Sequence, residues 1–302
     1  CIAITTGARM PAGANAVLMI EDTERDGDKV TIMRAVSPGN NIGKMGEDIT
    51  SGELVLKKGI MLSPGKVGVI ASQGLTAAAV YRKPRVAVMP TGEEIGAVGT
   101  KLNPEQIYDI NSHTVSAVIN QNGGEAVMMG ITGDNEQTLK TTLKEALKHD
   151  MVVISGGSSV GERDLLYKIL DEAGEVLFHG IQVKPGKPTL FAIVEGKPVF
   201  GMPGYPTSCL INAYLLLEPA MRRLSNLPPR KRCTEEAALN TNISGSVGRR
   251  QFLTVKLRDG KALPIFKESG AITTTAQADG YIVVAENIDI LPKGERVKVI
   301  LF

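Results

Sequence analysis

Short apolar runs alternate with stretches of helical periodicity between residues 85 and 225, and this alternation predicts the central architecture. The runs at residues 85–89, 126–131 and 151–155 are each followed by glycine or proline within two residues. Their length and their flanking turn residues are typical of buried strands. Strands that alternate with helices indicate a mainly parallel sheet covered on both faces. We therefore expect a doubly wound α/β domain over residues 86–225, with these three runs in one sheet.

Helical periodicity between the runs predicts the covering helices. Val115 and Val118 share one face of a helix expected at residues 112–122, and another helix is expected to begin at Asp134. Asp134 and Gln137 match a capping box, in which the first side chain caps the helix. Ligands of open α/β sheets collect at the carboxyl ends of strands, so a ligand role and a capping role both stay open for Asp134.

The second half of the central region is predicted to complete the sheet. We expect a strand, then a hairpin and a closing helix, at residues 176–178, 190–194 with 199–202, and 207–224.

Both flanking regions show the shorter runs and the turn residues of β structure. Residues 1–85 are predicted to be β-rich, with one short helix at 65–75 and strands at 16–20, 29–33 and 54–56. Adjacent prolines in a basic cluster at 226–232 indicate a linker. Beyond the linker, strand-like segments predict a small β-barrel domain within residues 226–302, at 252–257, 281–285 and 297–301.

Composition narrows the class of protein. The chain has 302 residues, of which 43% are apolar and 22% charged, as in globular proteins that bury a core. A net charge of +2 with few aromatic residues argues against nucleic-acid binding. No apolar run is long enough to span a membrane. Three widely spaced cysteines without a C-x-x-C pair predict neither a disulfide framework nor a zinc site, and favour the cytoplasm.

Three loops that follow strand-like segments predict an anion-binding site. They are Ser155-Gly156-Gly157-Ser158-Ser159, Lys184-Pro185-Gly186-Lys187-Pro188 and Met202-Pro203-Gly204-Tyr205-Pro206. Glycines allow backbone N–H groups to approach an anion, and a helix N-terminus adds partial positive charge. We therefore expect a phosphate or another oxyanion at this sheet edge. In the N-terminal region, the polar loops at 5–11 and 46–49 suit either a ligand or ordinary turn chemistry.

Eight motifs in order resemble the molybdopterin molybdenumtransferase family, which includes MoeA and the E domain of gephyrin. They are Thr6-Gly7-Ala8 with Met10-Pro11, Gly46-Glu47-Asp48-Ile49, Thr91-Gly92-Glu93-Glu94, Ser155-Gly156-Gly157 through Asp164, Lys184-Pro185-Gly186-Lys187-Pro188, Pro203-Gly204-Tyr205-Pro206, Gly248-Arg249 and Ala278-Asp279-Gly280. One such motif is weak, but eight in order along nearly the whole chain are specific. The N-terminal segment of the family, with its Met-Asp-Gly-Tyr-Ala-type motif, is not found. The chain is therefore expected to start inside the second domain of the family.

The resemblance implies a transferase that inserts molybdate or tungstate into adenylylated molybdopterin, with magnesium-assisted release of AMP. It implies Asp164, Asp134 and Glu94 as catalytic residues, with Asp134 and Asp164 as the Mg²⁺ ligands. A hard cation held by carboxylates suits this reaction, because breaking a phosphoanhydride builds charge on phosphate oxygens. The sulfurs that bind molybdenum belong to the pterin, which agrees with the lack of a cysteine cluster.

The resemblance also implies two sets of binding residues. Those for the oxyanion are Lys184, Lys187, Pro188, Ser208 and Arg249. Those for the pterin and nucleotide are Thr6, Asp48, Thr91, Gly92, Glu93, Gly156, Gly157, Ser159, Pro203, Gly204 and Pro206. A homodimer is implied as well, with cofactor-accepting enzymes as further partners, and neither nucleic acid nor a membrane is expected.

Three motifs depart from the family pattern. Tyr205 stands where the family usually has Asn, and Pro90 with Glu93 replace the usual Ser and Asp. Ser269-Gly270 reverses the expected Gly-Ser order and leaves the role of Ser269 open.

Two other function classes stay open. One is a related pterin- or nucleotide-processing enzyme of the same fold, either an adenylyltransferase or a deamidase, and ATP-dependent adenylylation of metal-free molybdopterin would favour it. An inactive protein with a saturable peptide partner would favour a gephyrin-like scaffold.

Overall fold

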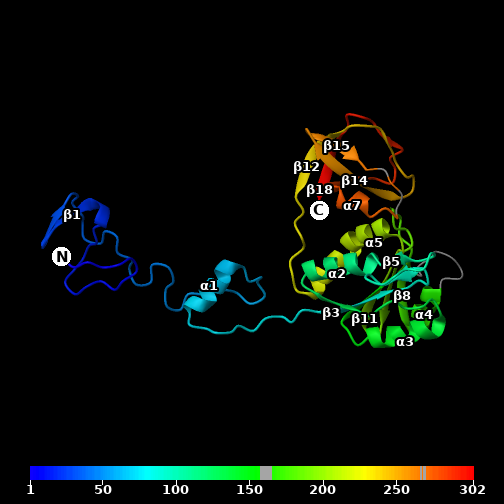
Figure 1. Ribbon diagram of the computed structural model, residues 1–302, viewed down its shortest axis with the longest axis horizontal. Helices are drawn as coiled ribbons and strands as arrows, with labels where there is room; N and C mark the ends of the chain where they lie inside the picture. Colours follow the sequence, from blue (N-terminus) through cyan, green and yellow to red (C-terminus); the bar gives the residue numbers. More distant parts are fainter. Residues whose placement is uncertain (157–164, 266, 268–269) are drawn as a thin grey trace. The chain divides into compact units, whose positions relative to one another are not determined.

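The computed structural model describes residues 1–156, 165–265, 267 and 270–302 of the chain (Figure 1). The chain separates into two compact units, Cys1–Ala78 and Ala79–Phe302. The boundaries of the three regions expected from the sequence, 1–85, 86–225 and 226–302, remain a prediction.

The N-terminal unit contains one hairpin and one helix. Strands β1 (Thr23–Asp26) and β2 (Lys29–Ile32) pair antiparallel after the short 3₁₀ helix η1 (Ile20–Asp22), and α1 spans Pro64–Ser72. The strand expected at 29–33 and the helix expected at 65–75 are therefore confirmed, although the strand ends one residue earlier and the helix three residues earlier than expected. The strands expected at 16–20 and 54–56 are wrong, since neither segment pairs with another strand.

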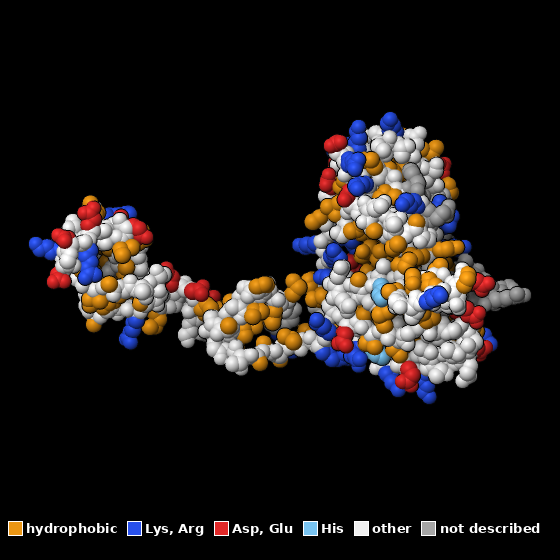
Figure 2. Space-filling view, viewed as in Figure 1, with side chains coloured by type: hydrophobic (Ala, Val, Ile, Leu, Met, Phe, Trp, Pro, Cys, Tyr) orange, Lys and Arg blue, Asp and Glu red, His pale blue; other side chains and the backbone are white. Residues whose placement is uncertain are grey.

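Every residue of the N-terminal unit is described, and none of them is buried. Apolar side chains that would form a core are open instead, including Ile20 at 80% and Leu54 at 72% exposure. Figure 2 shows apolar side chains spread over the surface of this unit. This explains why the strands expected at 16–20 and 54–56 do not form, because an apolar run becomes a stable strand only where it pairs with another strand and packs against a covering surface.

The C-terminal unit is built on a six-stranded sheet in the order β6-β3-β7-β11-β10-β8. Four neighbours run parallel, namely β6 (Glu125–Met128), β3 (Arg85–Pro90), β7 (Met151–Ser155) and β11 (Lys197–Met202). Two further strands extend the sheet: β10 (Leu190–Val194) pairs antiparallel with β11, and β8 (Gly174–His179) pairs antiparallel with β10. The three runs singled out in the sequence thus lie in one sheet, and the β10–β11 hairpin is confirmed.

Helices cover both faces of this sheet, as a doubly wound fold requires (Figure 1). Along β3, Val86 and Val88 point into one core, whereas Ala87 and Met89 point into the other. The first core is closed by helical segments at Asn111–Gln121 (α2), Pro206–Asn212 (α5), Ala213–Leu217 (η2, a π-helical turn) and Glu218–Leu224 (α6). The second is closed by Glu136–Ala146 (α3) and Leu165–Ala173 (α4). The expected α/β fold class is confirmed.

The cap of helix α3 is Asn135, which corrects the capping box expected at Asp134. The Asn135 side chain accepts a hydrogen bond of 2.9 Å from the Thr138 backbone N–H. Asn and Asp are equally good caps, so the choice depends on where the helix begins, and it begins one residue later than expected. Asp134 is therefore left for another role.

The last part of the chain forms a closed five-stranded barrel, again as expected. Its strands in order around the barrel are β15 (Lys261–Pro264), β12 (Thr234–Leu239), β18 (Arg296–Leu301), β16 (Gly280–Val284) and β14 (Arg250–Arg258), and β14 returns to β15. The β14–β15 hairpin turns at Asp259-Gly260, where both residues have positive φ, as two-residue hairpin loops require. The remaining short elements are Ile95–Gly96 (β4), Ile107–Tyr108 (β5), Val183–Lys184 (β9), Ile243–Ser244 (β13), Thr273–Ala276 (α7) and Ile290–Leu291 (β17).

The barrel is fastened to the α/β domain by buried contacts within the C-terminal unit. Glu218 of α6, whose side chain is only 5% exposed, pairs with Arg230 and Arg232 of the linker at 3.3 and 2.9 Å. The Arg232 guanidinium also lies over the rings of Tyr214 and Tyr281. The linker predicted from its prolines is therefore tied to both domains. In the part of the chain that the structure describes, no helix is both long and apolar enough to cross a membrane.

Candidate functional site

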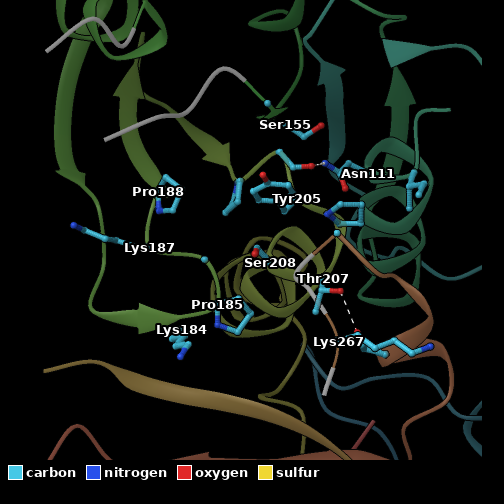
Figure 3. Close-up of a pocket in the computed structure, with 18 of the residues that line it drawn as sticks. Asn111, Ser155, Lys184, Pro185, Lys187, Pro188, Tyr205, Thr207, Ser208 and Lys267 are labelled. Carbon is cyan, nitrogen blue, oxygen red and sulfur yellow. Dashed lines mark hydrogen bonds between the residues drawn. The ribbon is translucent and has the colours of Figure 1, made fainter. Parts of the chain in front are cut away.

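One pocket of about 1610 Å³ lies where the carboxyl ends of the parallel strands meet the barrel. Figure 3 shows its lining residues coming from strand-to-helix loops, from α5 and from the barrel side. The pocket therefore occupies the position at which open α/β sheets bind their ligands. Eleven residues expected at the site line it, namely Thr91, Glu94, Gly156, Lys184, Lys187, Pro188, Pro203, Gly204, Pro206, Ser208 and Arg249.

The end of β7 brings two of the strand-end loops into close contact. The Thr91 N–H donates to the Ser155 carbonyl at 2.8 Å, and the Gly156 N–H donates to the Met202 carbonyl at 3.2 Å. Gly156 has φ +92°, and a Cβ there would lie 2.3 Å from the Thr91 carbonyl oxygen. Only glycine fits this position. Its own N–H is already used within the protein, so its contribution to the pocket is close approach of the backbones.

The lysine loop, Lys184–Pro188, is held from two sides. Strand β9 pairs parallel to β14 of the barrel, with Lys184 opposite Gln251. From the α/β side, the fully buried Asn212 of α5 donates through Nδ2 to the Gly186 carbonyl at 2.7 Å and contacts the Thr189 hydroxyl at 2.6 Å. The loop therefore spans the junction between the two domains, and its backbone is fixed there.

The charges that line the pocket are mainly positive. Lys184, Lys187, Arg249 and Lys267 are the cationic lining residues, against the carboxylates of Glu94 and Asp109. Among the described residues, none of the four cations has a carboxylate within ion-pair distance. Unneutralised cations in a concave site attract anions. The charge of this lining suits the anionic ligand expected from the sequence, and the identity of the ligand stays a prediction.

An acidic cluster lies at the end of β3, around Asp134. Burial raises the pKa of Asp134 above its ordinary value of 3.8, and the nearby negative charge of Glu94 raises it further. Hydrogen bonds from the Thr91 side chain and the Glu93 backbone lower the pKa in part, while the negative charge of Glu93 raises it slightly. Only Glu94 of the three lines the pocket, and Gly92 does not line it either. Among the described residues, no group of three or more His, Cys, Asp or Glu side chains could hold a metal ion.

Several expected site residues belong to the other compact unit or are not described. Thr6 and Asp48 lie in the N-terminal unit, and both are exposed. The expected residues Gly157, Ser159, Asp164 and Ser269 lie outside the described residues.

Sequence reasoning missed several polar residues of the site, and four of them bear on its geometry. Asn111 and Lys267 line the pocket, and so does the buried Gln251 of β14. Asn212 holds the lysine loop from behind. Asn111 could have been suspected because Asp109-Ile110-Asn111 directly precedes a predicted helix, where polar side chains often face a ligand. The other three carry no local signal, since nothing near them in the sequence marks a loop that binds anions.

The fold and the pocket together define the class of protein: an α/β protein with a mainly cationic pocket at the carboxyl edge of its sheet, lined also by residues of a C-terminal barrel. Family models agree along the chain. They match residues 1–74 as the MoeA N-terminal region (domain I and II), residues 94–223 as a Probable molybdopterin binding domain, and residues 236–302 as the MoeA C-terminal region (domain IV). The chain belongs to the molybdopterin molybdenumtransferase (MoeA) family.

Individual relatives support this assignment. The molybdopterin molybdenumtransferase of Staphylococcus epidermidis is 33% identical over 99% of this chain and 73% of its own length. That of Haemophilus influenzae is 35% identical over 83% of this chain, which spans 63% of the relative. A crystal structure of a MoeA protein from Pyrococcus horikosii is 42% identical with a TM-score of 0.80, over 98% of this chain and 74% of that one. The family is one of transferases in molybdenum cofactor biosynthesis, as the resemblance implied.

We expect Asn212→Leu to loosen the lysine loop without changing its charge. The substitution keeps the branched shape of the side chain but removes the amide that bonds Gly186 and Thr189, so unfolding in urea should show a loss of about 1–3 kcal/mol. Asn120→Leu is the matched control, because the Asn120 amide bonds the Ala126 N–H at 3.0 Å on the exposed surface. A loss no larger than in the control would mean that Asn212 does not hold the loop.

We expect Asp134→Asn to stabilise the protein at neutral pH. A carboxyl group whose folded pKa is raised binds its proton more tightly in the folded state, so its ionised form costs stability above that pKa. In buffer with a metal chelator, the melting temperature of the variant should exceed that of the wild type at pH 7, and the gain should shrink as the pH falls towards 4.

Asp150→Asn provides the comparison of opposite sign. The Arg82 guanidinium bonds Asp150 at 2.7 Å and lowers the pKa of that carboxyl from 3.8 to about 2. The ion pair therefore stabilises the fold above pH 3.8, and this contribution is lost as the pH falls towards 2. Its removal should cost about 1–2 kcal/mol after screening of the exposed Arg82, at pH 7 and still at pH 4. Equal shifts for both variants would contradict the assignment of Asp134.

Proposed function

We propose that this chain inserts molybdate, or tungstate, into adenylylated molybdopterin with release of AMP. The observation that carries the proposal is the lysine loop, fixed between two domains in a large pocket whose lining cations have no described acidic partner. Such a pocket suits a substrate with several negative charges. An α/β domain alone would lack Arg249, Gln251 and Lys267, which the barrel side supplies. This favours the transferase over an adenylyltransferase or deamidase that consists of the α/β domain only.

The oxyanion is proposed to bind at Lys184, Lys187, Pro188, Ser208 and Arg249. All five line the pocket, and Ser208 is nearly buried at 4% exposure in the first turn of α5. Lysine and arginine side chains supply charge-assisted hydrogen bonds to oxyanions. Because Lys184 lies in β9 and Arg249 immediately precedes β14, the pairing of these strands brings cations from both domains together.

Mg²⁺ is proposed to bind through Asp134 and Asp164, with Glu94 nearby as a catalytic carboxylate. The raised pKa of Asp134 is the observation that fits a cation here, because it reflects a carboxyl that is partly buried and lies near the negative charge of Glu94. Mg²⁺ usually takes one or two protein carboxylates together with water and substrate phosphates, so a set smaller than three acidic groups is sufficient. When bound, the ion would offset the negative charge that develops as the phosphoanhydride breaks.

The pterin and nucleotide are proposed to contact the strand-end loops of the pocket. Thr91, Gly156, Pro203, Gly204 and Pro206 already line it. Gly92 and Glu93 follow Thr91 in the sequence, and Gly157 and Ser159 follow Gly156. Thr6 and Asp48 are proposed to reach the pocket of a second subunit.

A homodimer is the proposed assembly, and cofactor-accepting enzymes are the proposed later partners. The absence of any buried residue in the fully described segment 1–78 supports dimerisation, because a segment of this size needs a covering surface to stay ordered. Its exposed apolar side chains are the kind that an obligate interface buries.

The proposed roles of Lys187 and Asp164 predict two different failures. Lys187→Ala should raise the molybdate concentration needed for AMP release about ten- to hundredfold, because a charge-assisted contact contributes about 1.5–3 kcal/mol. Asp164→Ala should lower the rate of AMP release at every molybdate concentration while adenylylated molybdopterin still binds. Steady-state assays with varied molybdate measure both.

Two exposed residues outside the pocket serve as matched controls for this experiment. Lys101→Ala and Asp171→Ala remove the same charges and should keep the activity of the wild type. Circular dichroism must first show that all four variants are folded. Rescue of Asp164→Ala, but not of Lys187→Ala, by excess molybdate would reverse the proposed roles.

Sedimentation equilibrium tests the homodimer. We expect a dimer at micromolar concentration for the chain, and a shift towards monomer when Ile20 and Leu54 are both replaced by serine. Those substitutions remove exposed apolar groups without touching a buried residue. A monomer at all concentrations would contradict the proposal.

A further inference from the structure

Asn111 has a buried hydrogen-bond acceptor that no described residue satisfies. Its side chain lines the pocket and is only 8% exposed. The Nδ2 atom donates to the Gly204 carbonyl at 2.8 Å, which fixes the orientation of the amide. The Oδ1 atom is buried and has no hydrogen-bond partner among the described residues. A buried polar atom without a partner is costly, so a ligand that donates a hydrogen bond here would gain from it.

Tyr205 brings an exposed aromatic side chain into the same pocket, one residue from the carbonyl that Asn111 binds. It follows Gly204, the residue whose carbonyl Asn111 holds, and it lines the same pocket at 67% exposure. Its backbone is fixed as well, because its carbonyl accepts a hydrogen bond of 2.9 Å from the Cys209 N–H at the start of α5. A Cβ added at Gly270 would lie 3.8 Å from Tyr205 Cδ1, so the backbone of Gly270 lies close to the ring.

This pair of residues suits a different ligand group from the lysine loop. Figure 3 shows Asn111 and Tyr205 towards one side of the pocket, with Lys184 and Lys187 towards the other. An amide oxygen and the face of an aromatic ring both carry partial negative charge, so neither attracts an oxyanion. A flat heterocycle with an N–H group matches both, because it stacks on aromatic side chains and donates a hydrogen bond.

We propose that Tyr205 and Asn111 form a ring subsite, in which a nitrogen heterocycle stacks on Tyr205 and donates an N–H to Asn111 Oδ1. The inference rests on the proposed function, whose substrate carries two such rings, a pterin and an adenine. It names the part of the pocket that selects the ring end of the substrate, as distinct from the cationic part that takes the oxyanion. The hydrogen bond from Asn111 to the Gly204 carbonyl holds the backbone from which the Tyr205 side chain extends.

Binding of two simple probes tests the subsite without turnover. The probes are AMP, which carries the adenine, and 6-hydroxymethylpterin, which carries the pterin ring without the dithiolene. Their affinities for the whole chain are measured by calorimetry for wild type, Tyr205→Ala and Tyr205→Phe. For the probe whose ring occupies the subsite, Tyr205→Ala should weaken binding about five- to hundredfold, whereas Tyr205→Phe should stay within about twofold. The probe that responds identifies the ring.

Tyr81→Ala is the matched control, because Tyr81 is 57% exposed and lies outside the pocket. It should leave both affinities unchanged. Asn111→Ala should weaken the same probe as Tyr205→Ala, and its melting curve must first show an intact fold. Wild-type affinities in Tyr205→Ala for both probes would overturn the proposal, and so would a lack of binding of either probe to the wild type at millimolar concentration.

The outcome is separate from that of the proposed function. A wild-type chain that binds a probe through Tyr205, yet releases no AMP from adenylylated molybdopterin with molybdate, would keep the ring subsite and reject the transferase reaction. A chain that releases AMP equally well with Tyr205→Ala, at unchanged affinity for the probes, would keep the reaction and reject the subsite.

Discussion

The lysine loop depends on two attachments that come from different domains. Asn212, buried in α5, holds the Gly186 carbonyl, while the pairing of β9 with β14 ties the loop to the barrel. Two lysines alone would be ordinary solvated side chains. They become parts of a pocket because the backbone beneath them is fixed at the junction of a sheet and a barrel. The geometry of the cationic part of the site is therefore a property of the domain junction, and neither domain possesses it separately.

The fold could be predicted well where burial follows from the sequence itself. Alternating apolar residues in β3 face two cores, and both cores lie within the C-terminal unit. The predicted strands and the predicted helix start were wrong where the structure depends on more than the sequence pattern of the segment itself. Residues 16–20 and 54–56 have apolar runs of the right length but find no partner strand within their unit. Helix α3 starts one residue later than its capping pattern suggested, since Asn135 and Asp134 are equally capable caps.

The site could be predicted in part, for a similar reason. The glycine and proline loops mark themselves in the sequence, and the lysine loop lies in the pocket as expected. The residues that hold those loops do not mark themselves. Asn111 reaches a carbonyl 93 residues away, and Asn212 reaches one 26 residues away. Each is an unremarkable polar residue of a helix until the fold places a loop against it. Resemblance to a family suggests which residues contact the ligand, whereas the residues that hold the loops in place are recognised only in the three-dimensional structure.

Strand β14 carries two partners along one edge, β15 near its end and β9 at its beginning. Closure of the barrel accounts for the first of these and would leave the initial residues of β14 as an open strand edge. Open edges are templates for pairing with other chains, and proteins commonly cover them. The lysine loop supplies that cover through β9. A substitution that releases the loop would thus weaken ligand binding and also expose an unpaired strand edge of β14. Loss of binding and a tendency to aggregate would therefore arise together.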